Sequence, residues 1–388
     1  MMKKFWIILF TLYSVSCGNN PLRQTIDPEI LIDEIGKEFA PDKRVAHYSI
    51  QHQLVKDQVV LSGETTEQSA KVALVAALKA MQVDLVDSAK LLVADPGLVN
   101  VSVCNIRAEP RHASELVTQS LLGTPLRIYK YENGWYYVQT PDQYLGWMDA
   151  GGLEILSDAL SAQWRRSEKI VVTAPFDFVK SSISKDNISD VTEGNILRVL
   201  GSQSNFYQVA LPDGRAGLLR KSSAQPYHDF LALNEPLVEN ILDKAREFLG
   251  RPYLWGGTSG KAMDCSGFTK TVFYLNGLVL PRDASQQVHV GDQVETDSTL
   301  RNLEPGDLLF FGRKAIDGNP DKVTHVSIYL GDGKMIHSSE RVQIQSLVPG
   351  DPNFAPKRLK TFLGARRMLD NVGINGVIPL SEHSDYKT

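Results

Sequence analysis

The segment AMDCSGFTK, residues 262–270, places a cysteine where a helix is expected to begin. Aspartate is a common helix-capping residue, so Asp264 is expected at the N-cap and Cys265 in the first turn of the helix. Unpaired backbone N–H groups and the helix dipole stabilise an anion there, so the position predicts a lowered pKa for the thiol. Gly267 carries no side chain that blocks an approaching substrate. Cys265 is therefore the candidate nucleophile.

A hairpin later in the chain offers the acid–base partner that a thiol nucleophile needs. Its turn is GDG at residues 331–333, which places His337 roughly opposite Ser327. His325 lies two residues before Ser327 on the same face, so the two imidazoles are expected to be diagonal neighbours. His325 then takes the proton of Cys265, and His337 orients His325, as in papain-like enzymes.

Composition excludes several other classes of protein. The chain has 388 residues and 43% hydrophobic residues, enough for two to four domains. The net charge is −4 and no long basic run occurs, so no nucleic-acid partner is expected. A cysteine and two histidines can also bind zinc, but here they are not at a local ligand spacing. We expect no metal, no cofactor and a monomer.

The N-terminus, MMKKFWIILFTLYSVSCGNN, predicts export. Two lysines precede an apolar stretch that is too short for a permanent membrane helix, and Cys17 follows small residues. Residues 1–17 resemble a bacterial lipoprotein signal, in which Cys17 receives the lipid; the alternative is a plain secretory signal with a chance cysteine. The expected location is the cell envelope, at a membrane surface. A disulfide between the other two cysteines is the disfavoured alternative.

The middle of the chain contains a repeat with a spacing of 71 residues. The matched residues are Gly123, Leu126, Ile128, Trp135, Tyr136, Val138, Pro141, Asp142 and Gly146, which recur as Gly194, Leu197, Val199, Phe206, Tyr207, Val209, Pro212, Asp213 and Gly217. Short strands with Pro-Asp turns predict two copies of a small all-β module, and both resemble the bacterial SH3 domain. We place them at 100–156 and 167–228. Tyr144 of the first copy corresponds to Arg215 of the second, which suggests a contact role for Tyr144.

The regions on either side of the repeat indicate that the chain belongs to the α+β fold class. Residues 21–98 alternate in hydrophobicity and then become helical, which predicts a small strand–strand–helix–strand domain that serves as a brace. Residues 234–370 show helices first and an antiparallel sheet afterwards, the pattern of an α+β domain. The last 18 or so residues are expected to form a loose tail.

Four motifs carry a resemblance to a known family. YLWGGTSGKAMDCSGF, RDASQQ, LEPGDLLFF and HVSIYLGDGKMIHSS are similar in type and order to the NlpC family of papain-like cell-wall cysteine peptidases. With two SH3-like domains upstream, the chain resembles the γ-D-glutamyl–diamino acid endopeptidases, which cut peptidoglycan stem peptides. The resemblance implies Cys265 as nucleophile, His325 as base and His337 as orienting residue. It also implies Tyr253 at the oxyanion region and Trp255 in the groove.

The same resemblance implies a site for a free amino terminus. Its expected members are Asp264, Ser285, Glu115 and Tyr144, with Ser266 as a further candidate. The carboxylates would pair with the ammonium of L-alanine, and the enzyme would release L-Ala-γ-D-Glu from peptidoglycan-derived peptides. The alternatives are a general endopeptidase or amidase on intact cell wall, and a wall-binding lipoprotein without catalysis.

Overall fold

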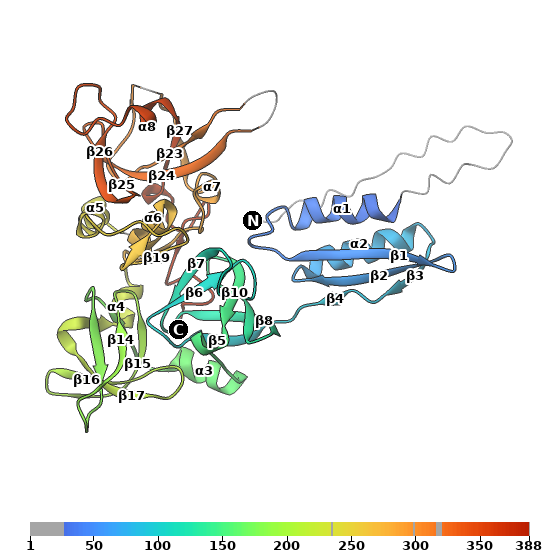
Figure 1. The fold of residues 1–388 in the computed structure, drawn as a ribbon, viewed down its shortest axis with the longest axis horizontal. Helices are drawn as coiled ribbons and strands as arrows, with labels where there is room; N and C mark the ends of the chain where they lie inside the picture. Colours follow the sequence, from blue (N-terminus) through green and yellow to red (C-terminus); the bar gives the residue numbers. More distant parts are fainter. Residues whose placement is uncertain (1–26, 234–235, 298, 316–319, 388) are drawn as a thin grey trace.

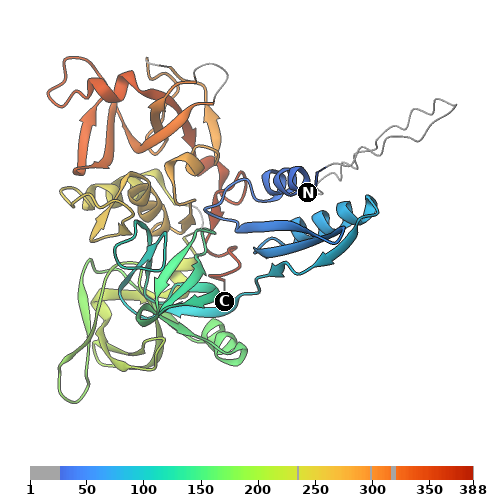
Figure 2. The same cartoon turned by 45° about the vertical axis from the view of Figure 1, so that its right-hand side comes forward.

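The computed structural model describes residues 27–233, 236–297, 299–315 and 320–387, so the predicted leader and Cys17 lie outside the described residues. Four units follow one another: an N-terminal unit (27–92), barrel 1 (95–155), barrel 2 (169–226) and a C-terminal unit (236–387). The two barrels lie beneath the C-terminal unit, and the N-terminal unit extends away from them (Figures 1 and 2). In the described ranges, no helix has the length and apolar character needed to span a bilayer.

The N-terminal unit packs two helices on a small sheet. Its elements are α1 (Pro28–Phe39), β1 (Tyr48–Val55), β2 (Gln58–Thr65), α2 (Gln68–Ala80), β3 (Asp84–Asp87) and β4 (Lys90–Leu91). The order β1-β2-β3, with β4 also on β2, agrees with the expected strand–strand–helix–strand pattern. The sequence analysis missed α1. Its signal was present, because Asp27 caps the helix by accepting a hydrogen bond from the Glu29 amide and Pro28 opens the first turn.

Barrels 1 and 2 have the same strand order, and their strands repeat in the predicted register. Barrel 1 contains β5 (Asp95–Val99), β6 (Val103–Arg107), β7 (Leu116–Leu121), β8 (Pro125–Glu132), β9 (Trp135–Gln139), β10 (Leu145–Asp149) and β11 (Leu153–Ile155). Barrel 2 contains β12 (Lys169–Val172), β13 (Asp177–Lys180), β14 (Asn187–Val191), β15 (Ile196–Gln203), β16 (Phe206–Ala210), β17 (Ala216–Arg220) and β18 (Ala224–Pro226). The orders β11-β5-β8-β9-β10-β6-β7 and β18-β12-β15-β16-β17-β13-β14 correspond strand for strand.

Individual cross-strand residue pairs also repeat with the 71-residue spacing. Ile128 pairs with Val138 in barrel 1, and Val199 pairs with Val209 in barrel 2. Between and after the barrels lie α3 (Asp158–Arg166) and α4 (Tyr227–Leu231). The repeat in the sequence is therefore a repeat of structure.

The C-terminal unit places helices against one six-stranded sheet. Its helices are α5 (Val238–Glu247), α6 (Cys265–Tyr274), α7 (Ala284–Gln287) and α8 (Pro356–Lys360). Its sheet has the order β22 (Asp292–Val294), β27 (Phe362–Arg367), β23 (Leu308–Arg313), β24 (Lys322–Gly331), β25 (Lys334–Ser339) and β26 (Arg341–Ser346). Short pairs are formed by β19 (Thr258–Ser259) with β20 (Ala262–Met263), and by β21 (Leu278–Val279) with β28 (Ile378–Pro379).

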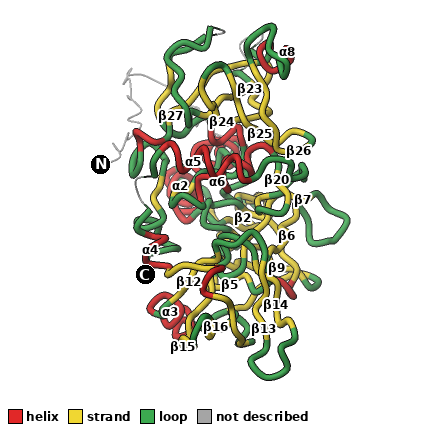
Figure 3. Tube along the Cα trace, turned by 90° about the vertical axis from the view of Figure 1, so that its left-hand side faces the viewer, coloured by secondary structure: helices red, strands yellow, loops and turns green. Residues whose placement is uncertain are grey.

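Helix α6 is fixed on both sides. Phe268 and Val272 are fully buried in one core with Val326, Ile328 and Ile336 of the sheet. Figure 3 shows α5 and α6 between the strands of the sheet and the two barrels. The residue at the start of α6 is thereby held by a packed core rather than by a mobile loop.

The expectation of a loose C-terminal tail is wrong. Leu380 is fully buried and Tyr386 is 8% exposed, in a cluster that also holds side chains of both barrels. The Tyr227 hydroxyl donates to the carbonyl oxygen of Tyr386 at 2.9 Å, and Nη2 of Arg127 donates to both carboxylate oxygens of Asp385. The tail therefore connects the C-terminal unit with both barrels.

Candidate active site

The start of α6 is held by a buried cluster of charges. Asp264 caps the helix, as predicted, by accepting a hydrogen bond from the Gly267 amide at 2.7 Å. The same carboxylate accepts hydrogen bonds from Arg282 at 3.1 and 2.5 Å and from the Gly256 amide at 2.9 Å. Arg282 is 1% exposed and also donates to Ser266 at 3.0 Å. The cap thus includes an ion pair that positions Cys265.

The structure gives Gly267 a packing role instead of the expected role in substrate access. A side-chain carbon at this position would lie 1.9 Å from the carbonyl oxygen of Gly257. The missing side chain lets the loop before the nucleophile pack directly on the first turn of α6. It serves this packing rather than the approach of the substrate.

The thiol of Cys265 lies in surroundings that favour its neutral form. Cys265 is free and half-buried. Burial, followed by the nearby Asp264 charge, raises the pKa of the thiol to about 11, although the backbone amides of Val326 and Ser266 act in the opposite direction. The prediction of a lowered pKa is therefore wrong for the free protein, because desolvation and Asp264 outweigh the favourable groups at the helix start.

The two histidines meet as the hairpin register predicted. Ile328 pairs with Ile336 in β24 and β25, and a bulge is confined to the turn end of these strands. The Nε2 atom of His325 lies 2.7 Å from Nδ1 of His337, with the rings edge to face. Their contact leaves Nδ1 of His325 for a second partner, which suits a base that is oriented through Nε2.

Both imidazoles are neutral at physiological pH. Burial is the main cause that lowers the pKa of His325 well below 6.5, and the charge of Arg358 acts in the same direction. The pKa of His337 falls to about 4, mainly through burial, while the side chain of Gln345 partly opposes the shift. A neutral thiol and a neutral imidazole suit general-base catalysis, in which the proton leaves as the sulfur attacks.

Tyr253 and Trp255 lie in the loop before the nucleophile. The Tyr253 amide donates to the carbonyl oxygen of Glu340 at 3.0 Å, and burial and the neighbouring thiol raise the pKa of its hydroxyl to about 12. The hydroxyl is therefore a hydrogen-bond donor at neutral pH. Trp255 is 62% exposed, and its indole N–H donates to Glu115 of barrel 1 at 2.7 Å.

Three of the five predicted amine-site residues lie where barrel 1 meets the C-terminal unit. Glu115 contacts Trp255, as described, and the Tyr144 hydroxyl donates to Asp283 at 3.1 Å. Ser285 lies in the same turn of chain as Asp283. Barrel 1 therefore borders the C-terminal unit beside the nucleophile loop.

The other two members are buried and already bonded. Asp264 is 6% exposed and Ser266 is 4% exposed, and both bind Arg282. A carboxylate in a buried ion pair is a poor additional partner for an ammonium group. Their observed role is the support of α6, and Asp283 is the carboxylate that barrel 1 approaches.

Arg44 of the N-terminal unit reaches the same corner. Its Nη1 donates to Asp283 at 2.7 Å and to the Ser285 hydroxyl at 2.8 Å. Arg44 also pairs with Asp42, and its carbonyl oxygen accepts from the Leu145 amide in barrel 1. Arg282 and Asp283 stood in the RDASQQ motif, but Arg44 gave no signal, because only the tertiary fold brings it there.

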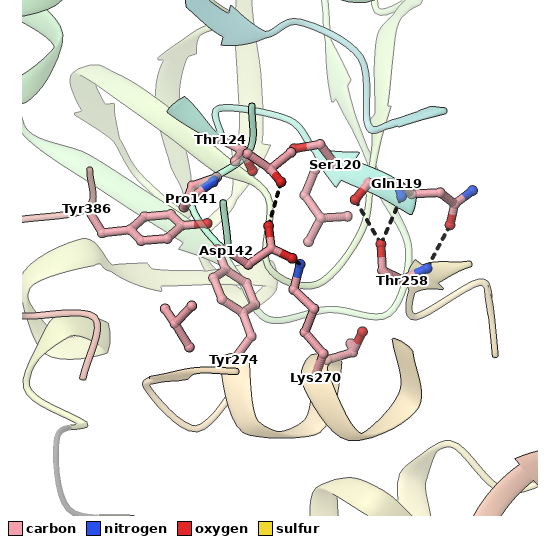
Figure 4. A pocket seen from close by; sticks show the side chains of 13 residues that line it. Gln119, Ser120, Thr124, Pro141, Asp142, Thr258, Lys270, Tyr274 and Tyr386 are labelled. Atoms are coloured by element: carbon pink, nitrogen blue, oxygen red, sulfur yellow. Dashed lines mark hydrogen bonds and ion pairs between the residues drawn. The ribbon is translucent and has the colours of Figure 1, made fainter. Parts of the chain in front are cut away.

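Barrel 1 is fastened to α6 around a cavity of about 50 Å³ (Figure 4). Lys270 of α6 points to Asp142 of barrel 1, and their charged atoms lie 2.5 Å apart. The Asp142 side chain is 1% exposed. Gln119 and Thr258 exchange three further hydrogen bonds between the two units. Among the described side chains, no group of three or more His, Cys, Asp and Glu has a metal-binding arrangement.

Known proteins match this architecture. Residues 250–356 match the NlpC/P60 family, and residues 106–153 match the bacterial dipeptidyl-peptidase SH3 domain. A gamma-D-glutamyl-L-lysine dipeptidyl-peptidase of Bacillus cereus is 32% identical over 267 residues, which are 66% of this chain and 77% of that protein. A protein of the same name from Bacillus subtilis is 31% identical, over 57% of this chain and 71% of its own.

A solved structure supports the match. The crystal structure of an NlpC/P60 family protein from Bacillus cereus is similar with a TM-score of 0.60 and 26% identity. The similarity covers 71% of this chain and 99% of that one. The SH3-like barrel and the papain-like unit therefore occur together in a known protein.

Proposed function

The chain belongs to the NlpC/P60 family of cysteine peptidases, and on this premise we propose that it hydrolyses the γ-D-glutamyl–diamino acid bond of peptidoglycan stem peptides. Its substrates have a free N-terminal L-alanine, and its product is L-Ala-γ-D-Glu. The names of the relatives, which specify a γ-D-glutamyl-L-lysine dipeptidyl-peptidase, support the bond. The single observation that carries the free-amine specificity is the contact of barrel 1 with the nucleophile loop and the Asp283 turn.

Two carboxylates of this corner are suited to an ammonium group. Asp283 pairs with Arg44, but both side chains keep partial exposure, and Glu115 is exposed, whereas Asp264 is buried together with Arg282. An ammonium held between Asp283 and Glu115 fixes the alanine end of the peptide. Tyr144 and Trp255 each bind one of these carboxylates and limit their rotation. A peptide that continues beyond the alanine meets barrel 1.

The residues of the C-terminal unit supply the chemistry. The sulfur of Cys265 attacks the γ-carbonyl carbon of D-glutamate while His325 takes the thiol proton. The Cys265 amide and the Tyr253 hydroxyl are the donors offered to the oxyanion. His325 then protonates the departing amine, the C–N bond breaks and a thioester remains. A water molecule, deprotonated by His325, hydrolyses the thioester and restores the thiol.

The test compares the tripeptide L-Ala-γ-D-Glu-L-Lys with its N-acetylated form. Acetylation removes the ammonium that Glu115 and Asp283 are proposed to hold, so we expect kcat/KM to fall by about 30-fold or more. Product analysis should show L-Ala-γ-D-Glu, and Cys265→Ala should show none. Equal rates on both peptides, or ready digestion of intact sacculi, would favour a general wall endopeptidase.

We further propose that the protein is exported and anchored at a membrane of the cell envelope through a lipid on Cys17. The basis is the sequence of residues 1–17 alone. Multiple acyl chains give stable anchoring, because each buried methylene contributes about 0.8 kcal/mol. Fractionation of cells that express the wild type and Cys17→Ser decides the matter. Equal release of both proteins into the soluble fraction would exclude the anchor.

A further inference from the structure

The groove opens past His325 into a second pocket, of about 430 Å³. His325 and Tyr253 belong to its lining, so the pocket borders the catalytic centre. Its other walls come from the ends of β23 and β25 and from α8. In the part of the chain that the structure describes, no residue of the barrels or the N-terminal unit lines it. The pocket is therefore distinct from the corner at Asp283.

The pocket carries an excess of positive charge. Among the described residues, Arg313, Lys357 and Arg358 line it together with one carboxylate, that of Glu340. None of the four forms an ion pair with a described residue. Arg358 is half-buried. Within the described ranges, its guanidinium has a 3.2 Å hydrogen bond to the Ser339 hydroxyl, the Phe311 ring nearby and the Cys265 thiol within electrostatic reach, but no carboxylate partner. A half-buried guanidinium without a carboxylate partner is a site for an anionic ligand group.

The chemistry of the reaction indicates that the leaving amino acid lies in this pocket. His325 donates its proton to the departing amine, so that amine lies against His325. The acyl part of the substrate extends the other way, toward barrel 1. The amino acid that is released must then occupy the space on the remaining side of His325, which is this pocket.

We propose that the pocket is the subsite for the released diamino acid, and that it prefers one whose side chain ends in a carboxylate as well as an amine, as in diaminopimelate, over lysine. The proposal rests on the proposed function. The carboxylate meets Arg358 and Lys357 or Arg313, and the amine meets Glu340. Lysine offers only an ammonium, which the three cations repel. The α-carboxylate at the end of a tripeptide has the same chemistry, so the test must separate the two.

The substrate panel consists of L-Ala-γ-D-Glu-X tripeptides, in which X is meso-diaminopimelate, its side-chain amide, or L-lysine. A second series carries an α-carboxamide in each case. We expect kcat/KM to be about 10- to 100-fold higher for diaminopimelate than for lysine in both series. Amidation of the side-chain carboxylate should remove most of this advantage.

Two outcomes would overturn the proposal, and both differ from failure of the proposed function. Equal rates with diaminopimelate and lysine contradict the subsite, and so does a loss caused by α-amidation alone. If no member of the panel releases L-Ala-γ-D-Glu, the proposed function itself fails.

Matched variants locate the preference in this pocket. In the double variant Arg313→Gln and Lys357→Gln, the ratio of kcat/KM between the diaminopimelate and lysine substrates should fall by about 10-fold, mainly through KM. Lys360→Gln removes the same charge from the same short helix but outside the pocket, and should keep the wild-type ratio. An unchanged ratio in the folded double variant, or an equal loss in Lys360→Gln, would overturn the assignment.

Discussion

Cys265 carries a thiol that its surroundings keep protonated, and this determines how it reacts with a simple alkylating agent. Because its pKa is raised to about 11, the thiolate fraction is small at pH 7 and grows as the pH rises. We expect the rate of alkylation by iodoacetamide to increase by about tenfold per pH unit between pH 7 and 9. Mass spectrometry of a Cys17→Ser protein measures the rate.

The control for this experiment is Cys265→Ala in the same background. It reports reaction at Cys104, whose burial raises the pKa of that thiol to about 12. A labelling rate that is already at its plateau below pH 8 would instead indicate a thiolate–imidazolium pair in the free enzyme.

His325 sets the acid limit of activity. As a base it must be neutral, and its pKa lies well below 6.5, so kcat/KM should hold through mildly acidic pH and fall only as the pH drops through this lowered value. Arg358→Gln removes one cause of the lowering and should move the acid limb to higher pH, while burial, the larger cause, remains. Lys360→Gln should leave the limb in place. If Arg358→Gln leaves the acid limb of the pH profile unchanged, the charge of Arg358 does not act on His325.

At the level of single residues, the sequence predicted the chemistry better than the electrostatics. The position of Cys265 at the start of a helix and the contact of His325 with His337 were predictable because each depends on a local motif or register. The raised pKa of Cys265 was not predicted, because it depends on burial and on the charge of Asp264, which Arg282 holds in place. The contact of Asp283 with Tyr144 was not predicted, since it arises only when barrel 1 docks.

At the level of elements, the start of α6 depends on a buried ion pair. Arg282→Met leaves Asp264 buried and charged without its main partner, which should lower the free energy of unfolding of the C-terminal unit by about 3 to 5 kcal/mol. Urea unfolding, followed together with loss of Cys265 reactivity, measures the effect. Arg301→Met breaks an exposed pair with Asp297 and should change it by less than about 1 kcal/mol.

A double variant separates the pair from other roles of Arg282. Asp264→Asn combined with Arg282→Met removes both charges, so it should be less destabilised than the sum of the two single variants. Simple additivity would mean that the two side chains do not act as a pair.

The secondary structure around the site could be predicted to different extents. The β24–β25 register followed from the GDG turn, although the bulge near Gly331 could not be foreseen from spacing. Helix α1 was missed despite its Asp-Pro start. Gly267 was interpreted wrongly, because the contact with Gly257 depends on a loop whose path the sequence does not define.

At the scale of the whole molecule, the repeat was predictable and the assembly was not. A constant spacing of 71 residues is a property of the sequence, and the equivalent pairs in the barrels follow it. The packing of the C-terminal tail against both barrels involves Tyr386 and Asp385, whose partners lie more than a hundred residues away.

The docking of barrel 1 should control the substrate specificity, and the Asp142–Lys270 pair tests this. Lys270→Met leaves the buried Asp142 carboxylate unpaired, which should weaken docking by about 3 to 5 kcal/mol. If barrel 1 excludes peptides that extend beyond the alanine, this variant should lose part of its preference for the free over the acetylated tripeptide while it still hydrolyses both. The comparison belongs at neutral pH: burial raises the pKa of Asp142, but Lys270 and Thr140 outweigh it and hold the pKa below 3.8, so the contribution of the pair is lost only in more acidic solution.

Lys261→Met is the matched control for this last prediction. Lys261 connects the same C-terminal unit to Asp190 of barrel 2, but that pair is exposed and should contribute less than about 1 kcal/mol. It removes one positive charge, as Lys270→Met does. Its contact with barrel 1 is a 3.3 Å hydrogen bond to the Ser102 hydroxyl, so the variant leaves the buried Asp142–Lys270 pair intact. We therefore expect the wild-type ratio of free to acetylated kcat/KM in Lys261→Met and a lower ratio in Lys270→Met. A ratio that is lowered equally in both variants, or in neither, would separate specificity from the docking of barrel 1 and leave Asp283 in the C-terminal unit as its main determinant.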